Sequence, residues 1–308
     1  MKAVRVHHFG GLDSLVTEDV PRPTPGAGEV LVRVKAAGVG PWDAWIRSGR
    51  SVLPQPLPLT LGSDVAGVVE SVGPGAAQFT PGDAVFGATN ARFTGGYAEY
   101  VAASATTLAR MPPGLGFIEA ASVPVVACTA WQMVFEHGAV DATTRVLVLG
   151  GAGNVGAYAV QLARRVAREV VATGSTVDAE YVRTLGADHV VDPRTSRFEH
   201  DVAGVDVVLD TIGGDTQDRS FAALKPGGVL VSAVSEPDQQ KAARHGVRAL
   251  FFLVEITSRR LEDIAALIEA EELRTRIGDV LPLAAARTAH EMLAGKPHKR
   301  GKIVLTVD

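Results

Sequence analysis

The sequence predicts an α/β protein of two domains, one made mostly of β-strands and one built on a doubly wound parallel sheet. The chain has 308 residues, enough for about two domains at ~150 residues each. Residues 1–120 are rich in glycine, proline and short alternating apolar runs, which is typical of antiparallel strands. From residue 121, apolar runs alternate with helix-length segments, as in a parallel sheet covered by helices on both faces.

The first region contains short strands separated by glycine- and proline-containing turns. Residues 29–35 place Val30, Val32 and Val34 on one face, the period expected of a half-buried strand. Further short strands are expected at 65–70 and 83–86. These features predict a mostly antiparallel β domain.

The second region begins with an apolar strand, a glycine cluster and a helix with an apolar stripe. The expected elements are strands at 145–149, 169–173, 188–191, 206–210 and 228–233, then helices at 260–274 and 284–294, and a closing strand at 302–306. Strands and helices that alternate in this way indicate a parallel sheet.

Composition excludes several classes of protein. The net charge is −4, with no block of Lys or Arg, so a nucleic-acid partner is not expected. Cys128 is the single cysteine, which rules out an intramolecular disulfide or a multi-cysteine metal site. No run approaches the ~20 apolar residues that span a bilayer, and the first residues alternate charged and apolar types. We expect a cytoplasmic protein without a membrane partner.

A glycine motif follows the strand at 145–149. Gly151-Ala-Gly153-Asn-Val-Gly156 matches G-x-G-x-x-G and opens a patterned helix, the context in which this motif binds a dinucleotide. Gly151 is expected to permit the tight turn, Gly153 to let the pyrophosphate approach, and Gly156 to let helix and strand pack closely. The free amides at the helix start, including those of Asn154 and Val155, suit phosphate groups.

The end of the next strand indicates which dinucleotide binds. An NAD site usually has Asp or Glu there to hold the ribose hydroxyls. Here the strand ends in Thr173-Gly174-Ser175-Thr176, whose hydroxyls could donate to a 2′-phosphate. Asp178 comes later, where we expect it to cap or stabilise the next helix. This pattern favours NADP(H) over NAD(H).

Several longer motifs resemble the medium-chain dehydrogenase/reductase superfamily across nearly the whole chain. They lie at 25–33, 36–39, 61–69, 95–100, 122–124, 129–131, 151–164, 185–188, 206–210, 225–228 and 300–305. The resemblance implies a GroES-like catalytic domain of residues 1–120 with 275–308, and a Rossmann dinucleotide-binding domain of residues 121–274.

The resemblance narrows to the zinc-independent quinone oxidoreductases, which include zeta-crystallin-like proteins. Zinc-dependent members need Cys and His as metal ligands. At the first of those positions this chain has Gly40-Pro41-Trp42-Asp43, and where they have Gly-His-Glu it has Gly62-Ser63-Asp64. No metal is therefore expected. Many relatives have Asn before the proline, so Gly40 loses any polar contact from that side chain.

The resemblance also implies a dinucleotide site. Its members are Pro41, Thr129, Gly151, Gly153, Asn154, Val155, Gly156, Thr173, Gly174, Ser175, Tyr181, Thr211, Ile212, Gly213, Ala233, Val234, Ser235, Phe251, Phe252, Val254, Lys299 and Arg300. Some relatives bind the 2′-phosphate with a Lys near Asp178 and a Tyr at the place of Pro193, and both are absent here. Ser175, Tyr181, Arg194 or the basic segment 298–300 could replace them.

The acceptor site is expected in loops of the first domain. Trp42, Trp45, Phe93 and Tyr97 would offer flat rings to a planar acceptor, although ordinary packing explains any one of them equally well. Asp64 is assigned to the same site, with a structural role in its turn as the alternative. No essential nucleophile is expected, and Tyr97 is a conceivable acid.

We therefore expect an NADPH-dependent, metal-independent oxidoreductase that transfers hydride to a quinone or an α,β-unsaturated carbonyl. A homodimer is expected, because in relatives the edge strand near 251–254 pairs with a second copy. Two alternatives stay open: an enoyl reductase acting on a carrier-bound substrate, and a catalytically idle NADP(H)-binding sensor or crystallin-like protein. The polar segment 235–247 fits a lid, a dimer contact or a surface loop equally well.

Overall fold

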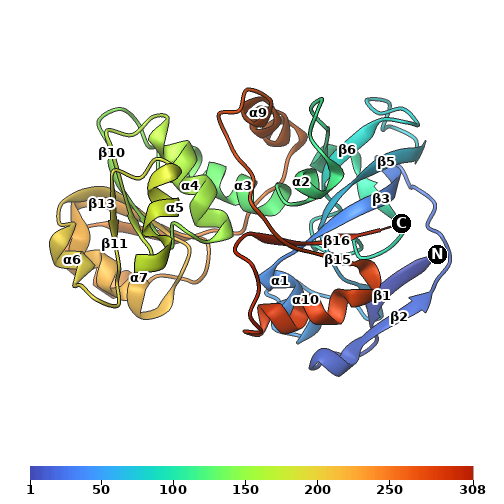
Figure 1. Ribbon diagram of the computed structural model, residues 1–308, viewed down its shortest axis with the longest axis horizontal. Helices are drawn as coiled ribbons and strands as arrows, with labels where there is room; N and C mark the ends of the chain where they lie inside the picture. The colour runs from blue at the N-terminus through green and yellow to red at the C-terminus, as the bar shows by residue number, and fades with distance from the viewer. Residues whose placement is uncertain (308) are drawn as a thin grey trace. The chain divides into compact units, whose positions relative to one another are not determined.

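The computed structural model describes residues 1–307 as two compact units (Figure 1). The first unit combines residues 1–125 with the segment that starts at residue 256, and the second unit is residues 126–255. Both predicted fold types are present, a mostly antiparallel β unit and a parallel-sheet unit flanked by helices.

The first unit contains two sheets. The larger has the order β15-β16-β3-β5-β6-β8, with β7 also paired to β3, and the smaller has the order β2-β1-β4. Their strands are β1 (Lys2–Val6), β2 (Leu15–Asp19), β3 (Glu29–Val39), β4 (Leu59–Thr60), β5 (Asp64–Val72), β6 (Ala84–Ala88), β7 (Tyr100–Ser104), β8 (Leu108–Arg110), β15 (Ile277–Pro282) and β16 (Lys302–Thr306). Val30, Val32 and Val34 are fully buried, as their alternation predicted.

Four α-helices belong to the first unit: α1 (Pro41–Arg47), α2 (Phe117–Ala121), α9 (Ser258–Glu269) and α10 (Ala286–Leu293). Helix α1 follows β3 directly and packs beside α10 (Figure 1). Helix α1 begins here because Gly40 is extended and Pro41 supplies a fixed φ at the first helical position. The end of β3 and the start of α1 therefore hold neighbouring side chains in fixed positions.

The second unit is a six-stranded parallel sheet of order β11-β10-β9-β12-β13-β14. Its strands are β9 (Arg145–Leu149), β10 (Glu169–Thr173), β11 (His189–Val191), β12 (Val205–Asp210), β13 (Leu224–Ser232) and β14 (Arg248–Phe251). Its helices are α4 (Asn154–Arg164), α5 (Ala179–Thr184), α6 (Phe198–Asp201), α7 (Gly214–Ser220) and α8 (Gln239–His245), while α3 (Pro124–Trp131) enters the unit and continues as a π-helical turn over Gln132–His137. The strand order reverses between β9 and β12, the point where doubly wound sheets bind dinucleotides.

The boundaries between the two units differ from the expected domain boundaries. The units divide after Val125 and after Glu255 instead of after residues 120 and 274. Helix α9, which we expected in the second domain, packs on β8 of the first unit, and the Ser258 hydroxyl donates to the Ala105 carbonyl at 3.1 Å. This tertiary contact has no local signature in the sequence.

Segment 235–247 contains α8, whose start is capped by the Asp238 side chain accepting from the Lys241 amide. Among residues 1–307, no helix has both the length and the apolar composition needed to cross a bilayer.

Candidate functional site

The glycine motif forms the turn between β9 and α4. The residue with left-handed backbone is Gly150, with φ of +81°. The tight turn therefore lies one residue before Gly151, the position predicted from the sequence. Gly151 is needed for space, because a Cβ there would lie 2.9 Å from the Cβ of Ala172. A Cβ at Gly156 would come within 2.1 Å of the Gly150 carbonyl oxygen, which explains the close packing of helix and strand.

The start of α4 offers donors to an anion. Gly153 is the N-cap, and Ala157 is the residue whose amide donates to the Gly153 carbonyl, at 2.8 Å. The amides of Asn154, Val155 and Gly156 belong to the first turn, where backbone N–H groups have no acceptor inside the helix. This turn lies at the carboxyl end of β9, so the residues present fit the pyrophosphate of a dinucleotide.

The loop after β10 is tied to the glycine turn. The Gly150 amide donates to the Thr173 hydroxyl oxygen at 2.9 Å, and the Gly151 amide donates to the Thr173 carbonyl at 2.8 Å. The Ser175 hydroxyl donates to Asp178 Oδ2 at 2.5 Å. Asp178 occupies the N-cap position of α5 without a side-chain capping bond, so its carboxylate is directed to this loop instead of the helix amides.

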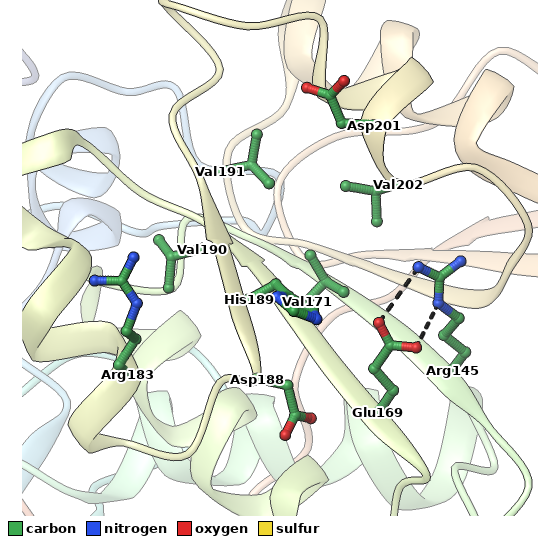
Figure 2. A pocket seen from close by; sticks show the side chains of 10 residues that line it. All are labelled: Arg145, Glu169, Val171, Arg183, Asp188, His189, Val190, Val191, Asp201 and Val202. Atoms are coloured by element: carbon green, nitrogen blue, oxygen red, sulfur yellow. Dashed lines mark hydrogen bonds and ion pairs between the residues drawn. The ribbon is translucent and has the colours of Figure 1, made fainter.

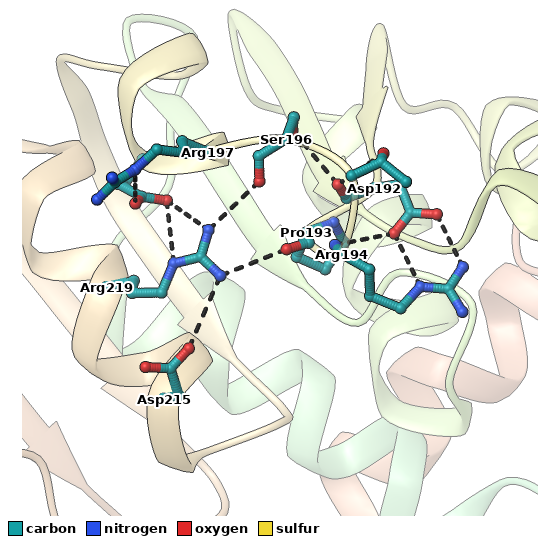
Figure 3. A network of polar contacts seen from close by, with 9 residues as sticks. Asp192, Pro193, Arg194, Ser196, Arg197, Asp215 and Arg219 are labelled. Carbon is teal, nitrogen blue, oxygen red and sulfur yellow. Dashed lines mark hydrogen bonds and ion pairs between the residues drawn. The ribbon is translucent and has the colours of Figure 1, made fainter.

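The loop after β11 carries a cation, Arg194, next to Asp192 (Figure 3). Arg194 forms a two-pronged pair with Asp192, with Nε to Oδ1 at 3.0 Å and Nη2 to Oδ2 at 2.8 Å. The same Oδ2 accepts from the Thr176 amide at 2.8 Å and from its hydroxyl at 3.0 Å. These donors, Arg194 above all, hold the pKa of Asp192 far below its usual range. The side chain of Arg194 remains 68% exposed.

A second polar network in Figure 3 fixes the segment that leads into α6. Arg219 Nη2 pairs with Glu199 at 2.7 Å, and Arg219 also donates to the carbonyls of Pro193 and Ser196. The Arg219 guanidinium lowers the pKa of Glu199 to about 2. Because Pro193 and Ser196 flank Arg194, this network fixes the backbone that carries the exposed guanidinium.

The carboxyl ends of β12 and β13 are joined by buried side chains that sequence reasoning missed. Gln217 Nε2 donates to Asp210 Oδ2 at 2.8 Å and to Ser232 Oγ at 3.1 Å, and Ser232 Oγ donates to Asp210 at 2.7 Å. Asp210 Oδ1 accepts from the amides of Ile212 and Gly213. A carboxylate at the end of β12 was visible in the sequence, but its partners could not be deduced from it.

The other predicted dinucleotide residues fall into two groups. Thr211, Ala233, Val234 and Ser235 follow β12 and β13, Phe251, Phe252 and Val254 end or follow β14, Tyr181 lies in α5, and Thr129 is buried in α3. Pro41, Lys299 and Arg300 belong to the first unit. Their contacts with a coenzyme stay predictions.

The start of α1 contains a buried carboxyl group. Asp43 Oδ2 accepts from the Gly40 amide at 2.8 Å and from the Tyr97 hydroxyl at 2.9 Å, and Asp43 and Tyr97 are both fully buried. Burial raises the pKa of Asp43 to about 7 and raises the pKa of Tyr97 well above its usual value. Tyr97 is therefore neither an exposed ring nor a ready acid, and we do not retain it as an acceptor contact.

A buried ion pair lies nearby in the same unit. Lys302 Nζ is 2.9 Å from Asp64 Oδ2, and the Val125 amide donates to Asp64 Oδ1 at 3.1 Å. Asp64 is fully buried, and burial raises the pKa of its carboxyl group despite the ammonium. Contact with an acceptor needs an exposed side chain, so the predicted substrate role of Asp64 is corrected to a structural one.

Three of the predicted acceptor residues keep exposed surface. Trp45 is 43% exposed, and Trp42 and Phe93 are partly buried against the core of the first unit. Trp42 Nε1 donates to Ser63 Oγ at 3.1 Å, and its ring lies 4.3 Å from Lys302 Nζ. Phe93 has φ of +60°, a conformation that is strained for a bulky side chain. Residues with such strained backbone are found most often at functional sites.

A pocket of about 390 Å³ opens elsewhere, along the edge strand β11 and at the amino ends of β9 and β10 (Figure 2). Its lining includes Arg145 and Glu169, which pair at 2.7 Å, with Asp188 and His189 at the start of β11. Dinucleotides bind at the carboxyl ends of such strands, so this pocket is not part of the dinucleotide site.

The residues at the expected zinc positions do not fit a metal. Ser63 accepts from Trp42, and Asp64 is neutralised by Lys302. Within residues 1–307, no three His, Cys, Asp or Glu side chains gather in a way that could hold a metal ion.

Comparisons with known proteins identify the family to which the chain belongs. Residues 26–113 match the family described as alcohol dehydrogenase GroES-like domain, and residues 185–305 match the family described as zinc-binding dehydrogenase. Human quinone oxidoreductase is 31% identical over 99% of this chain and 97% of its own length.

Two solved structures match this chain over its full length and over their own full length, each at 32% sequence identity. One is an NAD-dependent alcohol dehydrogenase, with a TM-score of 0.91. The other is a mycobacterial protein complexed with NADPH, with a TM-score of 0.87.

Proposed function

The chain belongs to the medium-chain dehydrogenase/reductase superfamily, in its quinone oxidoreductase branch, and we propose that it is an NADPH-dependent, metal-independent reductase of quinones or α,β-unsaturated carbonyls. The observation that carries the proposal is the glycine turn at the carboxyl end of β9, next to the point where the strand order reverses. That turn presents the first amides of α4 to a pyrophosphate.

The loops after β10 and β11 support NADPH as the coenzyme. Asp192 links them by accepting from Thr176, and the same carboxylate holds the exposed Arg194 guanidinium beside the loop where a 2′-phosphate would lie. In NADP-dependent proteins of this fold, an Arg near the end of the second strand accommodates the 2′-phosphate, and Arg194 could do so from the neighbouring loop. Asp178 counts against NADPH, because its carboxylate would repel the 2′-phosphate and could accept a hydrogen bond from the ribose hydroxyl of NADH.

This assignment can be tested by binding alone. The full chain is titrated with 2′,5′-ADP, which carries the 2′-phosphate, and with 5′-AMP, which lacks it. Arg194→Gln should weaken 2′,5′-ADP about tenfold or more and leave 5′-AMP unchanged, as expected for a charge-assisted contact. Asp178→Asn should strengthen 2′,5′-ADP. Arg197→Gln is the matched control, because Arg197 is exposed in the same loop and pairs with Glu199. Equal affinities in all variants would contradict NADPH selection by Arg194.

The residues at the zinc positions support metal independence. Ser63 Oγ accepts from Trp42 Nε1, and Asp64 Oδ2 is paired with the Lys302 ammonium, so both buried side chains are already engaged. Without a Lewis acid, the acceptor must delocalise the negative charge that hydride addition creates. Quinones and α,β-unsaturated carbonyls do this, because the charge moves onto oxygen.

The chain's residues bind and orient the reactants. When bound, NADPH supplies the hydride. The first turn of α4 fixes the pyrophosphate, and the network of Asp210, Gln217 and Ser232 fixes the loops after β12 and β13. Trp42 and Trp45 offer apolar rings to the acceptor. A quinone, NADPH and one proton give hydroquinone and NADP⁺, and water delivers the proton, because the Tyr97 hydroxyl is buried and bound to Asp43.

The reaction is tested by following NADPH and NADH oxidation with an ortho-quinone, a para-quinone, an alkenal and a saturated aldehyde. We expect turnover of a quinone or the alkenal, a preference for NADPH, and no reduction of the saturated aldehyde. Tight NADPH binding with no turnover of any acceptor would contradict the reductase and favour a coenzyme-binding sensor.

We also propose a homodimer. Strand β14 ends the sheet of the second unit and pairs with β13 on one side, which leaves its other edge for a second copy. Light scattering of the full chain should give twice the 32.2 kDa mass. A monomer across the micromolar range would contradict this assembly.

A further inference from the structure

The indole of Trp42 lies against the backbone of Gly40. A Cβ built on Gly40 would come within 2.3 to 2.5 Å of three atoms of the six-membered ring of Trp42. Carbon atoms in contact are about 3.5–4.0 Å apart, so no side chain fits at position 40 while the ring stays in place. The indole therefore takes the space of that side chain.

The backbone does not require glycine here. Gly40 has φ of −135° and ψ of 163°, an extended conformation that any residue adopts. The need for glycine comes from the Trp42 ring, whose atoms are the three nearest to the added Cβ. Gly40 and Trp42 consequently depend on each other in a way that neither residue reveals alone.

The ring is also fixed on its other sides. Its Nε1 donates to Ser63 Oγ at 3.1 Å, and the Lys302 ammonium lies 4.3 Å from the ring centroid, within cation–π range. Asp43 holds the Gly40 amide at 2.8 Å, which fixes the backbone on which the ring rests. Ser63 and Lys302 are buried, whereas Trp42 remains partly exposed. The indole is therefore the part of this cluster that solvent and ligands reach.

We propose that Gly40 and Trp42 form one specificity element, in which a fixed indole replaces a side chain at position 40 and selects acceptors with apolar aromatic rings over small aliphatic enals. The inference rests on the proposed function, which leaves both acceptor classes open. An aromatic wall adds dispersion contact with a fused-ring quinone and little with a short enal, which has few atoms to bury. A polar side chain at position 40 would reverse that balance.

The test combines stability with acceptor selectivity. The melting temperature and the ratio of kcat/KM for 9,10-phenanthrenequinone to that for crotonaldehyde are measured for wild type, Gly40→Ala, Trp42→Val and the double variant. Trp42→Val should lower the ratio roughly tenfold, the size of one aromatic contact. Gly40→Ala should lower the ratio and the melting temperature, and adding Trp42→Val should restore much of the lost melting temperature, because the clash is gone.

Gly10→Ala is the matched control. A Cβ at Gly10 would meet nothing closer than 3.6 Å, so the same change in the same unit should leave the melting temperature unchanged. If Gly40→Ala is too unstable to purify, Trp42→Phe keeps a smaller ring and should give an intermediate ratio.

The possible failures are distinguishable. Gly40→Ala with a wild-type melting temperature and ratio would overturn the coupling of the two residues. An active Trp42→Val variant with a wild-type ratio would overturn the specificity claim alone. A wild-type protein that binds NADPH and reduces no acceptor would overturn the proposed function and the specificity claim with it.

Discussion

Replacing Lys302 with Met should destabilise the first unit strongly, because it leaves a buried carboxyl group without its cation. Asp64 is fully buried, Lys302 is 2% exposed, and their charged atoms are 2.9 Å apart. Removing one partner of a buried pair costs about 3–5 kcal/mol in the free energy of unfolding. At about 2–4 °C per kcal/mol for a unit of this size, the melting temperature should fall by roughly 6–20 °C.

The pH dependence separates lost charge compensation from lost packing. Without Lys302, the folded-state pKa of Asp64 rises further above its unfolded value of about 3.9. The folded variant then binds more protons than the unfolded chain, so its stability falls as pH rises above about 4. The deficit relative to wild type should be smaller at pH 5 than at pH 8.

Calorimetry of wild type, Lys302→Met and the double variant Lys302→Met/Asp64→Asn provides the assay. The amide introduced by Asp64→Asn keeps an oxygen for the Val125 amide at the position of Oδ1 and carries no charge. The double variant should recover most of the loss, since replacing a whole buried pair is often close to neutral. A double variant as unstable as the single one, with a deficit that does not change with pH, would refute the reasoning.

The other buried and close-packed groups give three more predictions. The pKa of the Asp43 carboxyl group is about 7 in the folded protein and about 3.9 in the unfolded chain, so its contribution to stability is lost as pH rises from about 4 to 7. Asp43→Asn should therefore make the free energy of unfolding, measured with urea, less dependent on pH over that range. Burial lowers the pKa of His290 to about 4, so its contribution to the free energy of unfolding is lost as pH falls from about 6.5 to 4. His290→Leu should therefore lose less stability on acidification than wild type. A Cβ at Gly156 would collide with the Gly150 carbonyl at 2.1 Å, so Gly156→Ala should abolish NADPH binding in a fluorescence titration; retained affinity would contradict the role of this turn.

Features with a local signature were predictable from the sequence. The valine alternation of β3 and the strand–glycine–helix motif of β9 and α4 depend on residues a few positions apart, so hydrophobic period and turn chemistry were sufficient. The parallel arrangement of the second sheet also followed, because strands joined through helices have few topologies open to them. Even here, the left-handed residue was Gly150 instead of Gly151.

The polar interior was not predictable from the sequence. Asp64 was assigned to the acceptor site, with a structural role as the alternative. Its partner, Lys302, could not be identified because it lies 238 residues away in the chain. Tyr97 was assigned as an exposed ring, but its hydroxyl is bound to Asp43, 54 residues away. The dependence of Gly40 on Trp42 was equally hidden, because it is a steric relation that appears only once the side chains are placed.

The central claim is that this chain transfers hydride from NADPH to its acceptor without a metal. The most direct measurement uses chelator-dialysed protein, an alkenal, and NADPH carrying deuterium on either face of nicotinamide C4, followed by mass spectrometry of the product. We expect one of the two deuterated coenzymes to place a single deuterium on the β-carbon of the saturated aldehyde, with the chelator present. NADPH oxidation that delivers no deuterium from either coenzyme, or activity that appears only when zinc is restored, would contradict it.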